Sequence, residues 1–273
     1  AAGEGVADAE EQGPGEPVEE ARQYSAVKHA PETGAVIGVD VGYSPTRRSS
    51  AVCRLWWTGT VVGWEVDRFR YQDVDRELAF RKIAGAGPVL VAAFDGPLRR
   101  GLDQIGRYRE AERLLTVKNL RSRIGKPGQS SSRNGRDLNA AANICVAGLM
   151  DVCEIGPAKH PEAIHDLSVV EAFPTSFLGV LLNDPEKVAV RPPARSDAYF
   201  SHLAESGGLN RLLHHLLPDR RTTQNWRDVR DHDERAAIIC ALTALCVAAQ
   251  DYVAVGDDDG WIILPPDTLI APW

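Results

Sequence analysis

The sequence lacks the features that would indicate a membrane-spanning or secreted protein. No apolar run in its 273 residues approaches the ~20 residues that a transmembrane helix requires. Its N-terminal residues are acidic, whereas a secretory signal is basic and then apolar. We therefore expect a cytoplasmic protein that has no membrane partner.

Cysteine is also scarce, with five residues spread widely along the chain: Cys53, Cys145, Cys153, Cys240 and Cys246. An odd number of cysteines among aliphatic neighbours is typical of reduced core residues, and indicates neither a disulfide framework nor a zinc knuckle. His160 and His165 have no partners at metal-ligand spacing. No Ser or Cys with a paired His is evident, so the sequence predicts no acyl-transfer site.

The composition is that of a globular protein, because 44% of the residues are hydrophobic and 25% are charged. Residues 1–33 contain few large apolar side chains and are predicted to be a flexible acidic extension. Residues 34–265 are predicted to form the folded domain, with a basic helical insertion at about 99–165. Residues 266–273 would form a C-terminal tail.

The net charge of −7 hides an uneven distribution along the chain. Residues 99–136 hold eleven Lys or Arg against three acids, whereas residues 1–35 hold eight acids against two bases. A solvated helix and loop would explain the basic segment, but it is also the one candidate surface for nucleic acid. The predicted contacts are Arg99, Arg100, Arg109, Arg121, Arg123, Lys126, Arg133 and Arg136.

The order of apolar runs predicts an α/β fold with a mixed five-stranded sheet flanked by helices. Three antiparallel strands are expected at about 35–41, 49–57 and 60–66, followed by two parallel strands at 89–94 and 167–174. A helix at 73–84 would bury Val74, Leu78, Ala79 and Ile83. Further helices are expected at 108–116, 138–152, 175–182, 197–205, 208–216 and, deeply buried, 231–252, with a last strand at 261–264 on an edge of the sheet.

Four carboxylates stand at the ends of these elements: Asp40, Asp95, Glu171 and Asp233. An ionised carboxylate in an apolar strand costs several kcal/mol unless a cation or hydrogen-bond donors compensate it. Simpler explanations are that Asp40 anchors the following turn, that Asp95 begins a Gly-Pro loop, and that Asp233 caps the last helix.

Carboxylates that converge from different strands at one sheet edge would form a site for hard cations, which prefer oxygen ligands. Two Mg²⁺ or Mn²⁺ ions about 4 Å apart can activate water and stabilise the leaving oxygen in phosphodiester hydrolysis. Asp40 would bridge the ions, Asp95 and Glu171 would each complete a ligand shell or orient water, and Asp233 would reach in from the helix. These four residues are therefore the predicted metal-binding and catalytic residues.

The motifs that carry these acids occur in a recognisable order. Ile37-Gly38-Val39-Asp40-Val41-Gly42, Phe94-Asp95-Gly96-Pro97, Val170-Glu171-Ala172-Phe173-Pro174 and Asp233 before an Ala-rich helix resemble the domain-of-unknown-function 429 family (DUF429). Its members are predicted ribonuclease-H-like nucleases, distantly similar to RuvC-like resolvases. Arg109-Glu110-Ala111-Glu112 is also similar to that family's Arg-x-x-acid helix. The resemblance implies a ribonuclease-H-like fold and a metal-dependent nuclease, a hydrolase.

Two other functions are compatible with the same pattern. The family tends to carry a second acid three residues into the last helix, where this chain has Ala236, so a catalytically degenerate module that binds nucleic acid or a protein is one alternative. An Asp-x-Gly turn after the first strand also occurs in actin-like ATPases and sugar kinases. Gly125-Lys126-Pro127-Gly128 has no Walker spacing and follows no strand, so no phosphate loop supports a phosphotransferase.

Overall fold

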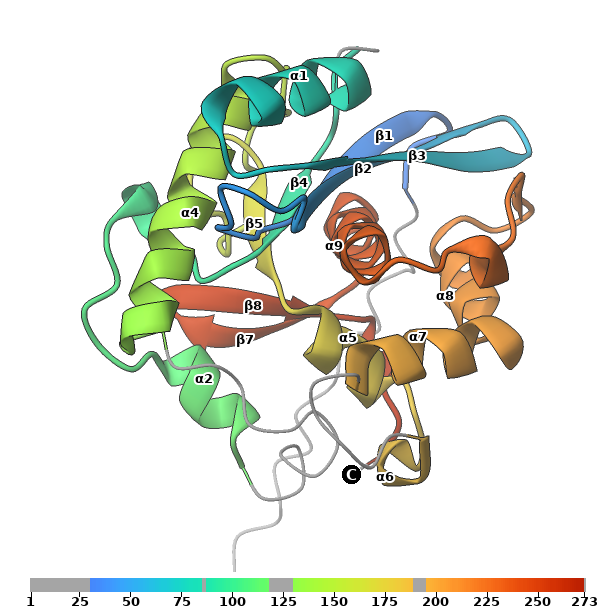
Figure 1. Ribbon diagram of the computed structural model, residues 1–273. Helices are drawn as coiled ribbons and strands as arrows, with labels where there is room; N and C mark the ends of the chain where they lie inside the picture. Colours follow the sequence, from blue (N-terminus) through green and yellow to red (C-terminus); the bar gives the residue numbers. More distant parts are fainter. Residues whose placement is uncertain (1–29, 85–86, 118–129, 189–194, 273) are drawn as a thin grey trace, which may run out of the picture.

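The computed structural model describes residues 30–84, 87–117, 130–188 and 195–272. Within these ranges eight strands form one mixed sheet, in the order β6-β3-β2-β1-β4-β5-β8-β7 (Figure 1). The strands are β1 (Gly34–Asp40), β2 (Ser50–Thr58), β3 (Val61–Phe69), β4 (Ala92–Asp95), β5 (Val169–Ala172), β6 (Arg221–Thr222), β7 (Val253–Asp257) and β8 (Gly260–Leu264).

The predicted five strands form the centre of this sheet. β1, β2 and β3 are antiparallel, and β4 and β5 continue parallel to β1, so this part of the prediction is confirmed. The sheet is larger than predicted because β6 lies beside β3, β8 lies beside β5, and β7 lies beside β8. The prediction that 261–264 forms an edge was wrong, since β8 pairs with β5 on one side and with β7 on the other.

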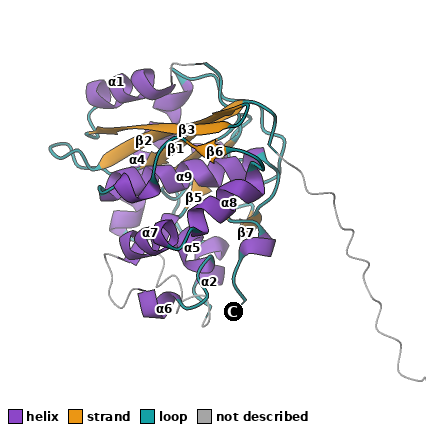
Figure 2. Ribbon diagram, turned by 90° about the vertical axis from the view of Figure 1, so that its right-hand side faces the viewer, coloured by secondary structure: helices purple, strands orange, loops and turns teal. Residues whose placement is uncertain are grey.

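Helices cover both faces of the sheet, which gives three layers (Figure 2). α1 and α4 lie on one face and α9 on the other, where α5, α7 and α8 pack beside it. The α-helices are α1 (Asp73–Ala84), α2 (Glu110–Leu115), α4 (Arg133–Met150), α5 (Pro174–Val180), α6 (Pro185–Val188), α7 (Arg195–Glu205), α8 (Gly208–Leu216) and α9 (His232–Ala248); the 3₁₀ turns are η1 (Arg100–Leu102), η2 (Trp226–Asp228) and η3 (Asp267–Leu269).

The inner face of α1 differs from the predicted one. Val74 and Leu78 are 71% and 63% exposed, whereas Ala79, Phe80 and Ile83 are buried. Phe80 packs edge-on against Phe69 of β3, with ring centroids 5.3 Å apart. The aromatic contact therefore sets the rotation of this helix about its axis.

α9 is buried on all sides from Ala236 to Val247, and it crosses β1 at Gly38. A Cβ atom on Gly38 would lie 2.1 Å from the backbone N of Ala241 and 2.2 Å from the backbone O of Ala237. Only glycine permits the helix and strand backbones to approach this closely. This contact fixes the position of α9 against the centre of the sheet, and with it the position of the N-terminus of α9.

The ends of the predicted domain are described in part. Residues 1–29 of the predicted extension lie outside the described residues, but Ala30 is buried and the carbonyl of Pro31 accepts a 2.7 Å hydrogen bond from Trp57 Nε1. In the predicted tail, η3 follows Pro266. None of the helices in the described ranges has the length and apolarity to span a membrane. All five cysteines are free and buried, as predicted.

Replacement of Gly38 by Ala should strongly destabilise the protein, because the added methyl group meets backbone atoms of α9 that side-chain rotation cannot move. We expect a loss of about 3 kcal/mol or more of unfolding free energy in urea denaturation. Gly106→Ala is the matched control, since a Cβ atom there meets nothing within 4 Å. Equal stability of the two variants would show that α9 does not approach β1 as described.

Candidate acidic site at the carboxyl edge of the sheet

Asp40 and Asp95 are the last residues of the adjacent parallel strands β1 and β4, and they are directly paired in register. Paired residues on neighbouring strands project from the same face, about 4.8 Å apart at Cα. Gly38 and Ala93, two residues earlier, lie on the α9 side of the sheet, so both carboxylates project to that side. On the neighbouring strands, Ala172 of β5 is paired with Asp95, Ala51 of β2 is paired with Asp40, and Arg68 of β3 is paired with Ala51, so these residues form one row across the sheet.

The turn after β1 does not use Asp40 as its anchor. The backbone N–H of Gly42 donates a 2.9 Å hydrogen bond to Ser50 Oγ, which in turn donates to the carbonyl of Gly42. Ser50 is fully buried. A serine therefore performs the anchoring role that was the simpler explanation for Asp40, and the Asp40 carboxylate is left to face the α9 side of the sheet.

The surroundings of this pair disfavour two negative charges. Burial raises the pKa of Asp40 well above its usual range, and the charges of Asp95, Asp233 and Asp231 raise it further, while Arg68 lowers it. Burial also raises the pKa of Asp95, to about 7, with a contribution from Glu171 that His232 opposes. Two carboxylates in such an environment favour a shared proton or a bound cation.

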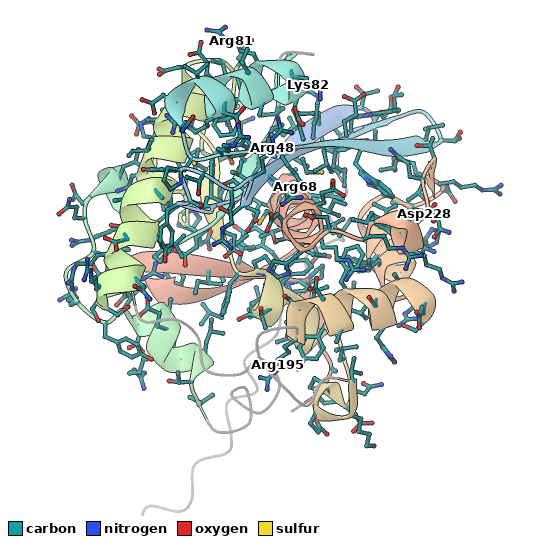
Figure 3. The ribbon with its side chains drawn as sticks, viewed as in Figure 1. Arg48, Arg68, Arg81, Lys82, Arg195 and Asp228 are labelled. Carbon is teal, nitrogen blue, oxygen red and sulfur yellow. The ribbon has the colours of Figure 1, made fainter. Side chains whose placement is uncertain are left out.

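The N-terminus of α9 adds two further carboxylates. Asp231 is the N-cap, and its side chain accepts hydrogen bonds from the backbone N–H groups of Asp233 and Glu234, so Asp231 rather than Asp233 caps the helix. Arg68 contacts both acids, with 2.7 Å ion pairs to Asp231 Oδ2 and Asp233 Oδ2. Figure 3 shows Arg68 beside the end of this helix. Asp233 is thus close to the pair but already held by a guanidinium group.

Glu171 belongs to a different group of side chains. It is paired in register with Phe94, not with Asp95, and its neighbours Val170 and Ala172 project toward α9. Glu171 therefore projects from the opposite face. There it accepts hydrogen bonds from Arg109 Nη1 and Nη2 at 2.7 and 2.8 Å, and from the backbone N–H of Leu98 at 2.7 Å.

Arg109 connects this carboxylate to a second buried acid. Arg109 Nε donates a 3.0 Å hydrogen bond to Glu112 Oε1, and Glu112 also accepts from the backbone N–H of Ser130. Burial alone would lower the pKa of Arg109, but Glu171 and Glu112 raise it, so the guanidinium group stays charged. Because its side chain is 1% exposed, Arg109 is not free to contact a phosphate backbone, and this corrects its predicted role.

The buried network holds the loop that follows the acidic pair. Leu98 is three residues after Asp95, and both its N–H and its carbonyl are bound, by Glu171 and Arg109 respectively. Asn139 of α4 holds the same loop by donating a 2.8 Å hydrogen bond to the carbonyl of Pro97. Glu171 and Arg109 are therefore positioning residues for the end of β4.

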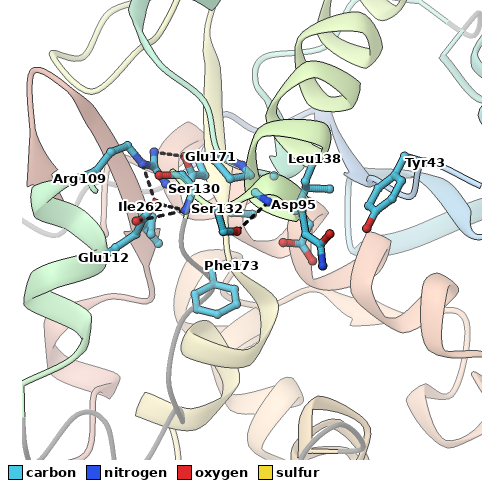
Figure 4. A pocket seen from close by; sticks show the side chains of 15 residues that line it. Tyr43, Asp95, Arg109, Glu112, Ser130, Ser132, Leu138, Glu171, Phe173 and Ile262 are labelled. Atoms are coloured by element: carbon cyan, nitrogen blue, oxygen red, sulfur yellow. Dashed lines mark hydrogen bonds and ion pairs between the residues drawn. The ribbon is translucent and has the colours of Figure 1, made fainter. Parts of the chain in front are cut away.

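A cavity of about 390 Å³ lies beside Asp95 at this edge. Figure 4 shows the Arg109, Glu112 and Glu171 network on one side of it and Tyr43 on the other. The first turn of α4 borders it as well, where Ser132 Oγ caps the helix by accepting a 3.0 Å hydrogen bond from the N–H of Gly135. The cavity is thus bordered by Asp95 of the acidic pair, by the N-terminus of α4 and by the loop that carries Tyr43.

The predicted basic surface is partly neutralised. Arg99 pairs with Asp259 in the β7-β8 turn at 2.8 Å, and Arg107 pairs with the same carboxylate at 2.6 Å. Arg100, Arg133 and Arg136 are exposed. Arg121, Arg123 and Lys126 lie outside the described residues, so their predicted contacts with nucleic acid stay predictions.

The four predicted metal ligands do not form one group in the structure. Across the described residues, no set of three or more His, Cys, Asp or Glu side chains is arranged to hold a metal ion. Two carboxylates such as those of Asp40 and Asp95 are a donor set for one hard cation, because proteins commonly hold Mg²⁺ by one or two carboxylates, with water and substrate oxygens as the other ligands. The raised pKa values of the pair are consistent with that fit, since a cation would relieve the repulsion.

Searches of protein-family models, curated proteins and solved structures found no match to this chain. The resemblance of its motifs to the DUF429 family therefore stays an expectation. The structure itself is an α/β fold with a mixed sheet.

Sequence reasoning missed three residues that shape the site: Arg68, Asp231 and Ser50. Asp231 carries a recognisable signal, since an Asp two residues before a helical acid is a common N-cap. Arg68 carries none, because its partners lie more than 160 residues away and depend on the sheet register.

Substitution of Arg109 by Met should severely destabilise the protein, because two buried carboxylates would lose their cation. Removal of one partner from a buried ion pair costs about 3–5 kcal/mol, which chemical denaturation can measure. Arg113→Met, one turn further along α2, is the control, because its pair with Glu110 is exposed and its loss should leave stability nearly unchanged. A small effect at Arg109 would contradict the described network.

The raised pKa of Asp95 should make the free energy of unfolding depend on pH in the absence of divalent cations. The folded protein keeps the proton of Asp95 up to about pH 7, whereas an unfolded chain loses it near the ordinary value of 3.8. The folded state therefore binds more protons in this window, and its stability should fall as pH rises through it. Asp95→Asn should flatten this dependence in denaturation curves recorded with EDTA; parallel curves for the two proteins would contradict the assigned pKa.

Proposed function

We propose that this protein is a metal-dependent hydrolase that cleaves phosphodiester bonds of nucleic acid, with Asp40 and Asp95 as the residues that hold the metal. The observation that carries the proposal is the in-register pairing of the two carboxylates at the carboxyl ends of parallel strands, where α/β sheets usually bind ligands. A bound Mg²⁺ or Mn²⁺ would supply charge stabilisation for a phosphoryl oxygen and a more acidic water.

The protein's own residues would divide the remaining work. Asp40 is the carboxylate that a cation would stabilise more, because Asp95, Asp231 and Asp233 all raise its pKa. Asp233 is a third candidate ligand, and it would have to exchange Arg68 for the metal. Glu171 is left out of the ligand set, because both of its oxygens already accept hydrogen bonds from Arg109.

The substrate class rests on the cavity and on the exposed arginines. The N-terminal end of α4 and Arg133 and Arg136 lie near the cavity, and a helix N-terminus and guanidinium groups both favour phosphate oxygens. Contacts of this kind are independent of base sequence and weaken with salt.

A catalytically degenerate module that binds nucleic acid is a second candidate, and two observations favour it. α9 has Ala236, which is buried, and therefore no carboxylate three residues after Asp233. Arg68 already forms ion pairs with both Asp231 and Asp233. Such a module would bind nucleic acid with the same salt dependence but would not cleave it.

Nuclease assays with single-stranded, structured and hybrid nucleic acids should separate the two candidates. We expect cleavage that needs Mg²⁺ or Mn²⁺ and stops with EDTA. Asp40→Asn should reduce it by about a hundred-fold or more, because even loss of an outer partner of a metal ligand costs up to that much.

Asp67→Asn is the matched control, because Asp67 is also a strand carboxylate but pairs with Lys82 of α1 at 3.0 Å, on the far side of the sheet. It should leave cleavage unchanged. Binding without cleavage by the folded wild-type protein would favour the degenerate module, and equal cleavage by wild type and Asp40→Asn would exclude the proposed site.

A further inference from the structure

A second cavity, of about 710 Å³, lies at the opposite edge of the sheet from Asp40 and Asp95. It is bordered by Leu90 and Val91 just before β4, by Ser168 just before β5, and by the segment that follows α9. This cavity therefore lies at the amino ends of β4 and β5, whereas Asp40 and Asp95 lie at the carboxyl ends of their strands. The two sites share no lining residue.

Ser168, His160 and Glu162 form a relay on the wall of this cavity. Ser168 Oγ lies 2.9 Å from His160 Nε2, and His160 Nδ1 lies 3.4 Å from Glu162 Oε2. The backbone of Ser168 is held on both sides, because its N–H donates to Gly156 O at 2.8 Å and its carbonyl accepts from Ala92 N at 3.0 Å. Its hydroxyl group is therefore presented to the imidazole by a fixed strand end.

The carboxylate of Glu162 lies beside Nδ1 of His160, on the side of the ring where the orienting acid of a general base stands. Burial lowers the pKa of His160, against the effect of Glu162, so the neutral imidazole is favoured. Tyr252 donates a 2.7 Å hydrogen bond to Glu162 Oε2 and holds that carboxylate beside the ring. His160 Nδ1 is buried and, among the described residues, makes no hydrogen bond; a small shift of Glu162 would supply one, and catalytic hydrogen bonds are often long without substrate.

We propose that Ser168, His160 and Glu162 form a second catalytic site, in which Ser168 is the nucleophile for hydrolysis of a carboxylic ester. The order of contacts, hydroxyl to imidazole to carboxylate, is the one by which serine hydrolases of unrelated folds activate serine. The site is independent of the proposed nuclease function, since its residues lie at the other end of the sheet.

The reaction balances with water as the only co-substrate. Ser168 Oγ attacks the ester carbonyl carbon while its proton moves to His160 Nε2; the C–O bond to the alcohol breaks, and that proton leaves with the alcohol. Water then attacks the acyl-serine, His160 takes its proton and returns it to Ser168 Oγ, and the carboxylic acid is released. Glu162 stabilises the imidazolium in both steps without taking a proton.

The walls of the cavity suit an apolar acyl group with a polar carbonyl. Leu90, Val91 and Val247 provide apolar surface, while Lys159 and Gln250 are the side chains on the wall that can donate hydrogen bonds to a developing oxyanion. A volume of this size accepts a medium-sized organic molecule. We therefore expect uncharged esters of short to medium acyl chains rather than charged acids.

The experiment is active-site labelling of the full-length protein with a fluorophosphonate probe, followed by peptide mapping, together with hydrolysis of p-nitrophenyl butyrate. Labelling should map to Ser168. Ser168→Ala should abolish labelling and ester hydrolysis, and His160→Gln should slow both by about a hundred-fold or more, the usual contribution of a positioned general base. Circular dichroism and thermal unfolding establish that each variant is folded.

His215→Gln is the matched control, since His215 also pairs with a carboxylate, Asp251, at 2.7 Å but faces no serine hydroxyl in the described residues. It should label and hydrolyse as the wild type does. If Ser168→Ala does not fold, the mapped peptide of the wild type decides. Labelling at another serine, or no labelling and no hydrolysis by the folded wild type, overturns the proposal.

Discussion

The close approach of α9 to β1 at Gly38 is the constraint on which the acidic edge depends. A side chain at position 38 would separate two backbones that now touch, and the N-terminus of α9 would move with the helix. That N-terminus carries Asp231 and Asp233 to the row of residues where Asp40 and Asp95 end their strands. Ala51 and Ala172 flank the pair in the same row, and these small side chains leave room for the groups that come from the helix. One glycine contact thus brings acids from three elements together.

Successive side chains of a strand project from opposite faces of the sheet, and this alternation places Glu171 on one face and Asp40 and Asp95 on the other. Glu171 projects to one face, where Arg109 and the N–H of Leu98 satisfy both of its oxygens. Asp40 and Asp95 project to the other face, where burial raises the pKa of both carboxyl groups and the charge of Asp95 raises that of Asp40 further. A buried carboxylate that is paired with a cation, such as Glu171, has a structural role. Two carboxylates that repel each other lower the stability of the fold, and such pairs with perturbed pKa values are typical of functional sites. The uncompensated pair is therefore the better candidate for ligand binding.

The sequence predicted the central sheet well because each strand is a short β-branched or apolar run bounded by Gly, Pro or Asp. It predicted Asp40 and Asp95 at one edge because the carboxyl ends of parallel strands share an edge, and the two residues are paired in register. The charge of Asp233 also reaches Asp40, whose pKa it raises. The prediction placed Glu171 with them wrongly, because the face from which a side chain projects depends on the register between neighbouring strands, which the sequence does not reveal. In the structure β5 pairs Glu171 with Phe94 and not with Asp95, so Glu171 projects from the other face. β7 was missed because no strand was predicted between the helix expected at 231–252 and the strand expected at 261–264. The rotation of α1 was missed because Phe80 outweighs Val74 and Leu78. The relay at His160 was missed because its acid follows two residues later while its serine follows eight, a spacing without periodicity.

Arg68 links the charge balance of the acidic edge to its proposed chemistry. Among the described residues it is the guanidinium group that lowers the pKa of Asp40, yet its two short ion pairs go to Asp231 and Asp233. Arg68 supplies one positive charge to the two acids that it pairs with, so the group of Arg68, Asp231 and Asp233 carries a net negative charge, and such a group repels the phosphate groups of a nucleic acid. A cation at Asp40 and Asp95 would remove that repulsion and at the same time lessen the demand on Arg68, which would be free to turn toward a phosphate oxygen. Metal binding and substrate binding would then be positively coupled, because each lowers the electrostatic cost of the other.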